Sequence, residues 1–291
     1  MFQSIRVNRF LLSFCVAAAV AAAAAGVCAG SSAVQTAANS HDEGVCLPVV
    51  MYHSVLKEKK RQGKYVIPPE LFESDLRFLR DKGYRTVTVR EVVDFVQNGT
   101  PLPEKPVMLT FDDGYYNNFL YAFPLAKQYG AKIVVAPVGY YTDLFTTGDA
   151  DHASYSYLTW PEISNMMSSG LVEFQSHSYN LHTLGKRRGA SRMRGESAGA
   201  YAAVLREDAG RMQDEMKEKT GYAPIAFVYP FGISSAGSDG ILRQMGFQAT
   251  FLCTEKLNFI SRDPQCLYSL GRFLRPAGIS SESYFKKIGL I

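Results

Sequence analysis

The chain has 291 residues, of which 47% are hydrophobic and 20% charged, and its formal net charge is +4. These values describe an ordinary globular protein and exclude a collagen-like, low-complexity or strongly charged disordered chain. The charge is also too small to favour nucleic acid as a partner, because Arg6 and Arg9 near the N-terminus supply half of it. A chain of this length accommodates one large α/β domain.

The first 29 residues have the pattern of a secretory signal peptide. Arg6 and Arg9 form a basic start, residues 10–27 are uncharged and rich in alanine, and Val27-Cys28-Ala29 offers a small-residue cleavage site. An uncleaved membrane anchor is the alternative, since the apolar segment approaches the length of a membrane span. Residues 30–44 are small and polar and are expected to form a flexible leader. We therefore expect a secreted or cell-envelope protein with one domain over residues 45–291.

Three cysteines remain after such a signal, namely Cys46, Cys253 and Cys266. Export permits a disulfide, and Cys253 with Cys266 is the local candidate pair. An odd number leaves one thiol over, so free cysteines are the alternative.

From residue 45 onward, apolar strand patterns alternate with helical ones. Strands are expected over residues 45–52, 86–89, 107–111, 132–138, 171–175, 225–229, 248–253 and 270–274. Helices are expected over residues 69–83, 88–99, 124–129, 159–170, 200–219, 238–245 and 280–288. Two of them begin with a capping box, at Thr88 with Glu91 and at Thr159 with Glu162. Seven or eight such βα repeats in one domain predict a distorted or incomplete (β/α)7-8 barrel of TIM-like type.

Chemistry-bearing residues follow several of these strands. Asp112 and Asp113 end the strand Val107-Met108-Leu109-Thr110-Phe111, while His53 and His177 each follow another strand. The carboxyl ends of barrel strands meet at one face, where active sites are built. An acidic turn is the structural alternative for the Asp pair, because Asp and Gly are ordinary turn residues.

His182 follows His177 by five residues, a spacing that does not place both on one face of a straight helix. A loop can still bring both imidazoles inward. One carboxylate and two imidazoles, with open coordination positions, are typical of a catalytic metal site. Histidines held in the core or on the surface are the alternative, and His41 and His152 lie in polar segments where we expect them to be solvated.

Together these motifs resemble the polysaccharide deacetylases, the NodB-homology family of carbohydrate esterase family 4. The resemblance covers residues 47–276 and rests on Thr110-Phe111-Asp112-Asp113-Gly114, the His177–His182 loop and Tyr229-Pro230-Phe231-Gly232. The opening Pro48-Val49-Val50-Met51-Tyr52-His53-Ser54 and the five-residue histidine spacing are similar to the poly-N-acetylglucosamine deacetylase branch. The family implies hydrolysis of N-acetyl groups on a polysaccharide.

The resemblance also implies a role for each matching residue. Asp113, His177 and His182 would bind a divalent metal, with zinc as the expected ion and other divalent transition metals as the alternative, and Asp112 would be the general base. A metal-activated water would attack the N-acetyl carbonyl. The backbone N–H of Phe231 would help to hold the oxyanion.

The sequence departs from the common family pattern in two places. Val228 or Tyr229 stands where an arginine usually opens the Pro-Phe-Gly turn, and no histidine follows His182. In the branch named above, the early Tyr-His motif is expected to supply the general acid, which makes His53 the candidate. Capping of the first strand is the alternative role for His53. Arg272, near the last strand, could orient Asp112 or assist at the substrate.

Two basic segments follow strands that end at the active-site face, residues 57–64 and residues 186–194. Solvated loops are the plain interpretation, and contact with an anionic cell wall or membrane surface is the functional one. Tyr115, Tyr116, Trp160 and Phe231 could stack on sugar rings or pack in the core.

We therefore expect an exported metal-dependent deacetylase acting on a GlcNAc-containing polysaccharide, either poly-N-acetylglucosamine or peptidoglycan. A non-catalytic or weakly active glycan-binding member of the same fold is the alternative, because two family motifs are incomplete. A glycosidase would also use two carboxylates, but it places them about 5 Å or more apart and needs no histidine pair.

Overall fold

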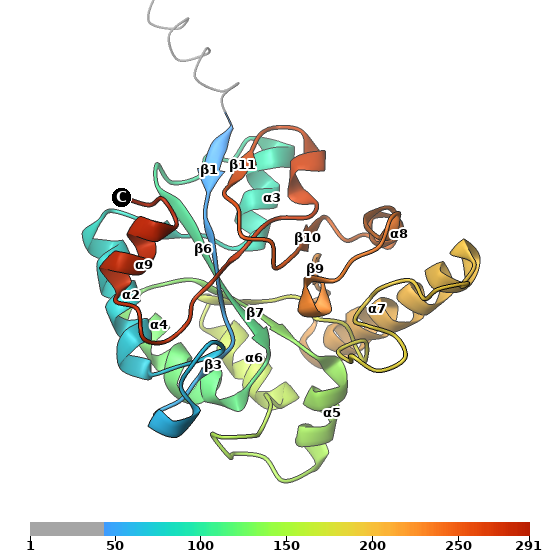
Figure 1. Ribbon diagram of the computed structural model, residues 1–291, viewed down its shortest axis with the longest axis horizontal. Coiled ribbons are helices and arrows are strands. Elements are labelled where there is room, and N and C mark those ends of the chain that lie inside the picture. The colour runs from blue at the N-terminus through green and yellow to red at the C-terminus, as the bar shows by residue number, and fades with distance from the viewer. Residues whose placement is uncertain (1–43) are drawn as a thin grey trace, which may run out of the picture. The chain divides into compact units, whose positions relative to one another are not determined.

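Strands surround the centre of the structure and helices lie outside them (Figure 1). The computed structural model describes residues 44–291. The predicted signal, most of the predicted leader and His41 lie outside the described residues. Seven parallel segments form the ring: β2 (Val49–Tyr52), β6 (Pro106–Asp113), β7 (Ile133–Pro137), β8 (Val172–Phe174), β9 (Ala226–Val228), β10 (Ala249–Phe251) and the segment that ends in β12 (Phe273–Leu274).

The ring is uneven, which makes it a distorted barrel. Continuous parallel ladders run through β12, β2, β6, β7 and β8, and a separate ladder joins β9 to β10. Single parallel bridges close the two gaps, Ser176 with Phe227 and Phe251 with Leu270. The buried Gln175 adds hydrogen bonds across the first gap. Its side-chain oxygen accepts from the backbone N–H groups of Ile225 and Ala226 at 2.9 and 2.7 Å. The predicted fold class is confirmed.

Strand β6 is the central strand of the long ladder, and all eight of its residues are buried. It pairs with β2 on one side and β7 on the other, and its first residues also pair with β5 (Arg85–Thr86). Its odd-numbered apolar residues pack with one core cluster and Met108 with another. Alternate side chains of a strand face opposite sides. Asp112 therefore continues the side of Met108, which packs with residues of β2, β7, β9 and β10.

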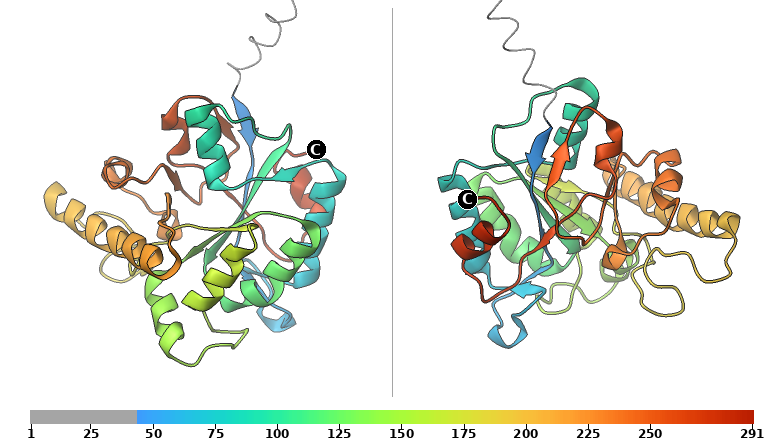
Figure 2. Two further views of the ribbon diagram at one scale, coloured as in Figure 1. Left: turned by 180° about the vertical axis from the view of Figure 1, so that it is seen from behind. Right: turned by 45° about the horizontal axis from the view of Figure 1, so that its top comes forward.

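The helices pack around the outside of the ring, as the two views of Figure 2 show. They are α2 (Pro69–Asp81), α3 (Val89–Asn98), α4 (Phe123–Tyr129), α5 (Gly139–Thr147), α6 (Trp160–Ser168), α7 (Ala198–Thr220), α8 (Ser238–Gln244) and α9 (Ser281–Lys287). Both predicted capping boxes are present, at Thr88 with Glu91 and at Thr159 with Glu162. Within residues 44–291, no helix is both long and apolar enough to cross a bilayer.

Several predicted elements differ from the observed ones. The strand expected over residues 86–89 stops at Thr86, because Thr88 already caps α3. Residues 45–52 form two strands on either side of Pro48, and β1 (Val45–Leu47) pairs antiparallel with the unpredicted β11 (Asn258–Ile260). Helix α5 was not predicted, since it begins at Gly139 and its N-cap Val138 provides no side-chain hydrogen bond.

The remaining short elements lie in the connections. They are β3 (Ser54–Val55), β4 (Val66–Ile67) and the short helices η1 (Lys59–Arg61), η2 (Asn118–Ala122), η3 (Pro230–Gly232) and η4 (Pro264–Leu267). Strands β3 and β4 pair in parallel and form the base of the basic segment 57–64.

The candidate disulfide is absent. Cys46, Cys253 and Cys266 are all free thiols in the described part of the chain. The sulfur of Cys253 lies 3.8 Å from that of Met51, whereas the sulfur of Cys266 lies 3.7 Å from the backbone oxygen of Ser261. The two thiols thus have different neighbours, so the alternative of free cysteines holds.

Candidate active site

The two adjacent aspartates at the end of β6 have different surroundings. Asp112 continues the strand, whereas Asp113 adopts a left-handed backbone with φ 68° and Gly114 follows with φ 76°. A β-carbon at Gly114 would lie 2.6 Å from the Cβ of Pro137 on β7, so only glycine fits here. This turn replaces the strict alternation of a strand and allows both carboxylates to serve one site.

Arg272 holds Asp112 in a bidentate ion pair. Its two terminal nitrogens donate to Oδ1 and Oδ2 of Asp112 at 2.6 and 2.8 Å, and its Nε donates to the backbone oxygen of Leu252. Arg272 is fully buried, so it lies beneath the site and touches the carboxylate rather than the solvent. Burial alone would raise the pKa of Asp112, but the positive charge and the hydrogen bonds of Arg272 outweigh it and hold that pKa well below its usual range. Asp112 is therefore ionised at neutral pH.

Asp113 faces the two histidines of the His177–His182 loop. Its Oδ1 lies 3.5 Å from Nε2 of His177 and 3.1 Å from Nε2 of His182. His177 Nδ1 lies 2.8 Å from the backbone oxygen of Val228, which can only accept, so Nδ1 carries the proton and Nε2 presents a lone pair. Burial lowers the pKa of His177 to about 3 and also lowers that of His182. These contacts are therefore not ion pairs.

The donor set of these three residues fits a divalent cation. Ligand atoms from Asp113, His177 and His182 lie within 4.8 Å of one another. Oδ1 of Asp113 is buried and accepts no hydrogen bond from any residue that the structure describes. A carboxylate oxygen facing an imidazole lone pair is repulsive unless a cation lies between them. Burial also raises the pKa of Asp113 to about 6, and the negative charge of the neighbouring Asp112 adds to the rise.

His53 also lies close to Asp112. Its Nε2 is 4.0 Å from Oδ2 of Asp112, and the ring of Tyr65 packs edge-on against it with centroids 4.9 Å apart. The His53 side chain is 15% exposed, so one edge reaches the solvent. The structure thus brings together all five residues predicted at the centre of the site: His53, Asp112, Asp113, His177 and His182.

The Tyr229-Pro230-Phe231-Gly232 turn closes a further side of the site. Phe231 has φ 58°, and its ring packs on His182 with centroids 4.3 Å apart. A β-carbon on Gly232 would lie 2.6 Å from the backbone nitrogen of Cys253, which explains the glycine. The hydroxyl of Tyr229, one of the two candidates for the position of the family arginine, contacts Ser238 and Asp239 at 2.7 and 2.8 Å.

The aromatic candidates divide between site and core. Phe231 is 37% exposed and Tyr115 is half-buried beside Asp113 and Tyr157. Trp160 is buried, and its indole N–H donates to Asp143 at 2.8 Å. Phe231 and Tyr115 remain available to a substrate, whereas Trp160 belongs to the junction of α5 and α6.

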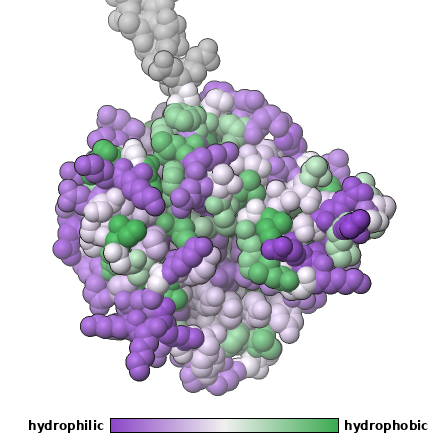
Figure 3. All heavy atoms as spheres, viewed as in Figure 1, coloured by the Kyte–Doolittle hydropathy of each residue, from purple (hydrophilic) through white to green (hydrophobic). Residues whose placement is uncertain are grey.

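The two basic segments also differ. Residues 57–64 are exposed apart from Gln62, and Figure 3 shows a hydrophilic projection where η1 lies in Figure 1. In the second segment, Arg187 forms a bidentate ion pair with Glu196, and Arg192 donates to the backbone oxygen of Glu196 at 2.7 Å. Residues 57–64 are therefore the more available of the two basic surfaces.

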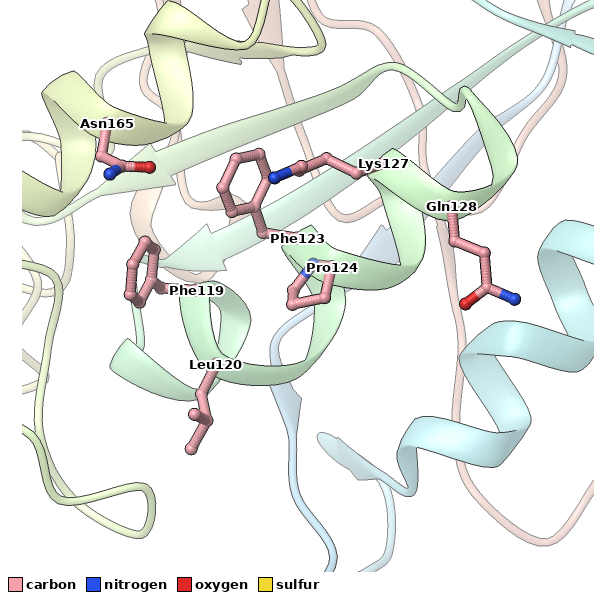
Figure 4. A pocket seen from close by; sticks show the side chains of 7 residues that line it. All are labelled: Phe119, Leu120, Phe123, Pro124, Lys127, Gln128 and Asn165. Carbon is pink, nitrogen blue, oxygen red and sulfur yellow. The ribbon is translucent and has the colours of Figure 1, made fainter.

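A separate pocket lies on η2 and α4, and Asn165 of α6 also lines it (Figure 4). It is lined by the apolar side chains of Phe119, Leu120, Phe123 and Pro124, with Lys127 and Asn165 at its rim. None of the predicted site residues lines it. The pocket lacks the acid and imidazole groups of the site, and we assign it no part in the chemistry.

The site includes residues that the sequence did not reveal. Asp208 on α7 accepts hydrogen bonds from the backbone of the His177–His182 loop, and Tyr65 packs on His53. Each lies in a segment without a recognisable motif. A carboxylate in the middle of a long amphipathic helix gives no sequence signal of a partner almost 30 positions away.

Comparison with known families identifies the chain. A family model described as polysaccharide deacetylase matches residues 99–250, which is more than half of the 291 residues. The chain belongs to the polysaccharide deacetylase family. The match includes the Asp112–Asp113 turn and the His177–His182 loop, so the predicted family is confirmed.

Curated relatives point to one branch of this family. The chain is 27% identical over 221 residues to the poly-beta-1,6-N-acetyl-D-glucosamine N-deacetylase of Escherichia coli strain K12, a match that covers 69% of this chain and 33% of that protein. It is 23% identical to the enzyme of the same name from Staphylococcus aureus strain MSSA476, covering 71% and 67%. The chain thus spans about a third of the length of the E. coli relative.

Solved structures share the fold. A de-N-acetylase from Aggregatibacter actinomycetemcomitans superposes with a TM-score of 0.68 at 29% identity, covering 84% of this chain and 100% of that one. IcaB from Ammonifex degensii gives a TM-score of 0.65 at 27% identity, covering 85% and 97%. Both agree with the distorted barrel described above.

Proposed function

We propose that this polysaccharide deacetylase family member is an exported, metal-dependent enzyme that hydrolyses N-acetyl groups on a GlcNAc-containing polysaccharide. Poly-N-acetylglucosamine is the first candidate substrate because relatives from two organisms carry that name. Peptidoglycan is the second. Export rests on the pattern of residues 1–29, which lie outside the described residues.

The observation that carries the proposal is the division of labour between two adjacent acids. Both oxygens of Asp112 accept hydrogen bonds from Arg272, whereas Asp113 faces His177 and His182 with an oxygen that accepts no hydrogen bond within residues 44–291. One acid is thus available for a proton and the other for a cation. A plain acidic turn would leave both carboxylates in solvent, and here both are buried.

Asp113, His177 and His182 would hold the metal, with zinc as the expected ion. When bound, a divalent metal supplies Lewis-acid activation of water and of the substrate carbonyl. Val228 fixes the His177 ring through its Nδ1–H, so that Nε2 remains free to ligate. Burial keeps both imidazoles neutral, the form that coordinates metal.

The chain's own residues would then move the protons. Asp112, ionised and oriented by Arg272, accepts a proton from the water that attacks the N-acetyl carbon. The backbone N–H of Phe231 donates to the oxyanion of the tetrahedral intermediate. His53 donates a proton to the amide nitrogen as the C–N bond breaks, which releases acetate and leaves an amine on the sugar.

His53→Ala is expected to keep zinc affinity close to that of the wild type and to lower kcat by about 10²-fold or more, the usual contribution of a general acid. The reason is that His53 lies 4.0 Å from Asp112 and is not among the three clustered ligands. Steady-state kinetics and zinc titration on the same preparation check this. Unchanged kcat would remove His53 from the proton path.

An acetate-release assay tests the function as a whole. Poly-N-acetylglucosamine, peptidoglycan and chitin oligomers are each incubated with the protein as isolated, after chelation, and after zinc is restored. We expect acetate from at least one substrate, loss after chelation and recovery with zinc. Glycan binding without acetate release under any condition would instead identify a non-catalytic member of the fold.

The exposed basic segment 57–64 is proposed to contact an anionic cell-wall polymer or lipid surface near the substrate. It follows the strand end that carries His53, and Tyr65 at its end packs on the His53 ring. Surface charge attraction weakens with salt, because the Debye length falls to about 8 Å at physiological ionic strength. Binding to anionic vesicles or wall fragments that is unaffected by salt would contradict this contact.

A further inference from the structure

The loop that carries the two histidines needs support from outside itself. Between His177 and His182 the backbone is neither helix nor strand, and Ser178 adopts a left-handed conformation with φ 71°. Such a loop cannot satisfy its own backbone N–H groups through a ladder or a helical turn. Its shape therefore depends on the groups that accept those hydrogen bonds.

The carboxylate of Asp208, on helix α7, accepts two of them. Oδ1 accepts from the backbone N–H of Tyr179 at 2.8 Å, and Oδ2 accepts from that of Asn180 at 2.7 Å. Two hydrogen bonds to one ionised carboxylate fix both position and orientation. Because α7 is 23 residues long, Asp208 is carried by an extended helix rather than by another loop.

The side chain of Tyr179 fastens the same loop to the same helix. The guanidinium of Arg211, one turn after Asp208, stacks over the Tyr179 ring at 3.6 Å. The Tyr179 hydroxyl donates to Asp143 on α5 at 2.9 Å. A β-carbon on Gly139 would lie 2.6 Å from this ring, so the ring is closely packed. Tyr179 is thus held both through its backbone N–H and through its side chain.

His182 depends on this support more than His177 does. The ring of His177 is fixed independently by the backbone oxygen of Val228. His182 lies two residues after Asn180, and the backbone N–H of the intervening Leu181 donates to Ser178 Oγ at 3.1 Å inside the loop. A displacement of Tyr179 and Asn180 would therefore move His182 relative to Asp113.

We propose that Asp208 is a positioning residue of the metal centre, which holds the loop between His177 and His182 so that both imidazoles face Asp113. This inference rests on the metal site of the proposed function. The hydrogen bonds that Asp208 accepts come from the backbone N–H groups of Tyr179 and Asn180, so it acts through the backbone of the loop.

Zinc affinity of the full chain tests the proposal, measured by competition with a chromophoric chelator. In Asp208→Asn the side-chain amide keeps one oxygen as an acceptor, but its NH₂ group faces the second backbone N–H, which then has no acceptor. We therefore expect the zinc affinity to fall by about 10- to 100-fold, as for other residues that hydrogen-bond to metal ligands or support them. Asp214→Asn is the matched control, because it makes the same change at an exposed position of α7. Asp208→Glu restores both acceptors and is expected to recover most of the lost affinity.

The absorption spectrum of the Co²⁺-substituted protein provides a second readout, since a displaced His182 changes the ligand geometry around the ion. Circular dichroism of the metal-free variants verifies that they are folded. Equal zinc affinity in Asp208→Asn and Asp214→Asn would overturn the positioning role while the metal site stands. A folded Asp208→Glu as weak as Asp208→Asn would also overturn it. Failure of the wild type to bind zinc would overturn the proposed metal site itself.

Discussion

Asp112→Asn is expected to retain zinc and to lower the kcat of acetate release by about 10²- to 10⁴-fold, the contribution of a positioned general base. Asparagine has nearly the same shape as aspartate but cannot take up a proton at neutral pH. It also keeps an oxygen that can accept one hydrogen bond from Arg272. Because the three clustered ligand groups do not include Asp112, the metal set is unchanged.

The neighbouring position provides the control. Asp113→Asn alters a proposed ligand, so it is expected to lose zinc and, with it, activity. Zinc titration of both variants separates the two roles, and single-turnover kinetics of zinc-loaded Asp112→Asn measures the chemical step. Equal loss of zinc in both variants would show that the two acids share the metal, and the proposed division between base and ligand would then be wrong.

The Asp112–Asp113 turn shows how far the sequence alone reaches. The apolar run before it identifies a buried strand, and period-two alternation places Asp112 on the Met108 side of β6. The glycine after the acids identifies the turn. Capping boxes at Thr88 and Thr159 likewise have local causes and were predicted from local patterns.

The contacts that tune the acids were harder to predict because they join distant parts of the chain. Arg272 and Asp112 are 160 positions apart, and the sequence suggested Arg272 either to orient this acid or to assist at the substrate. Its complete burial favours the first role. Asp208 and α5 gave no local signal. A carboxylate on a helix has the same sequence context whether it is solvated or bound to a loop, and α5 lacks the capping side chain that marks a helix start.

The structure contains a second buried fork that resembles the first. Arg275 donates to Asp75 through Nε and a terminal nitrogen at 2.8 and 3.0 Å, and both side chains are fully buried. Asp75 also accepts from the Tyr52 hydroxyl at 3.0 Å. Burial raises the pKa of Asp75 despite Arg275, whereas the charge of Arg272 outweighs burial at Asp112 and lowers its pKa. The Arg272–Asp112 pair therefore belongs to the active site, whereas the Arg275–Asp75 pair belongs to the core.

Removing either arginine tests this distinction. Arg272→Met and Arg275→Met are each expected to lower the free energy of unfolding by about 3–5 kcal/mol, because each leaves a buried carboxylate without its partner. Urea denaturation at neutral pH measures this. In the wild type the folded-state pKa of Asp112 lies below the unfolded value, so its contribution to stability is present above the unfolded pKa and is lost as the pH falls toward the folded one.

The pH dependence of activity separates the two variants. Without Arg272, burial dominates and the pKa of Asp112 rises, so the acid limb of kcat/KM is expected to move to higher pH. Arg275→Met leaves the surroundings of Asp112 intact, and its acid limb should match that of the wild type. The profiles are measured on zinc-saturated protein, at a temperature where both variants are folded. An acid limb that moves equally in both variants would mean that the shift reflects lost stability rather than the Arg272–Asp112 pair.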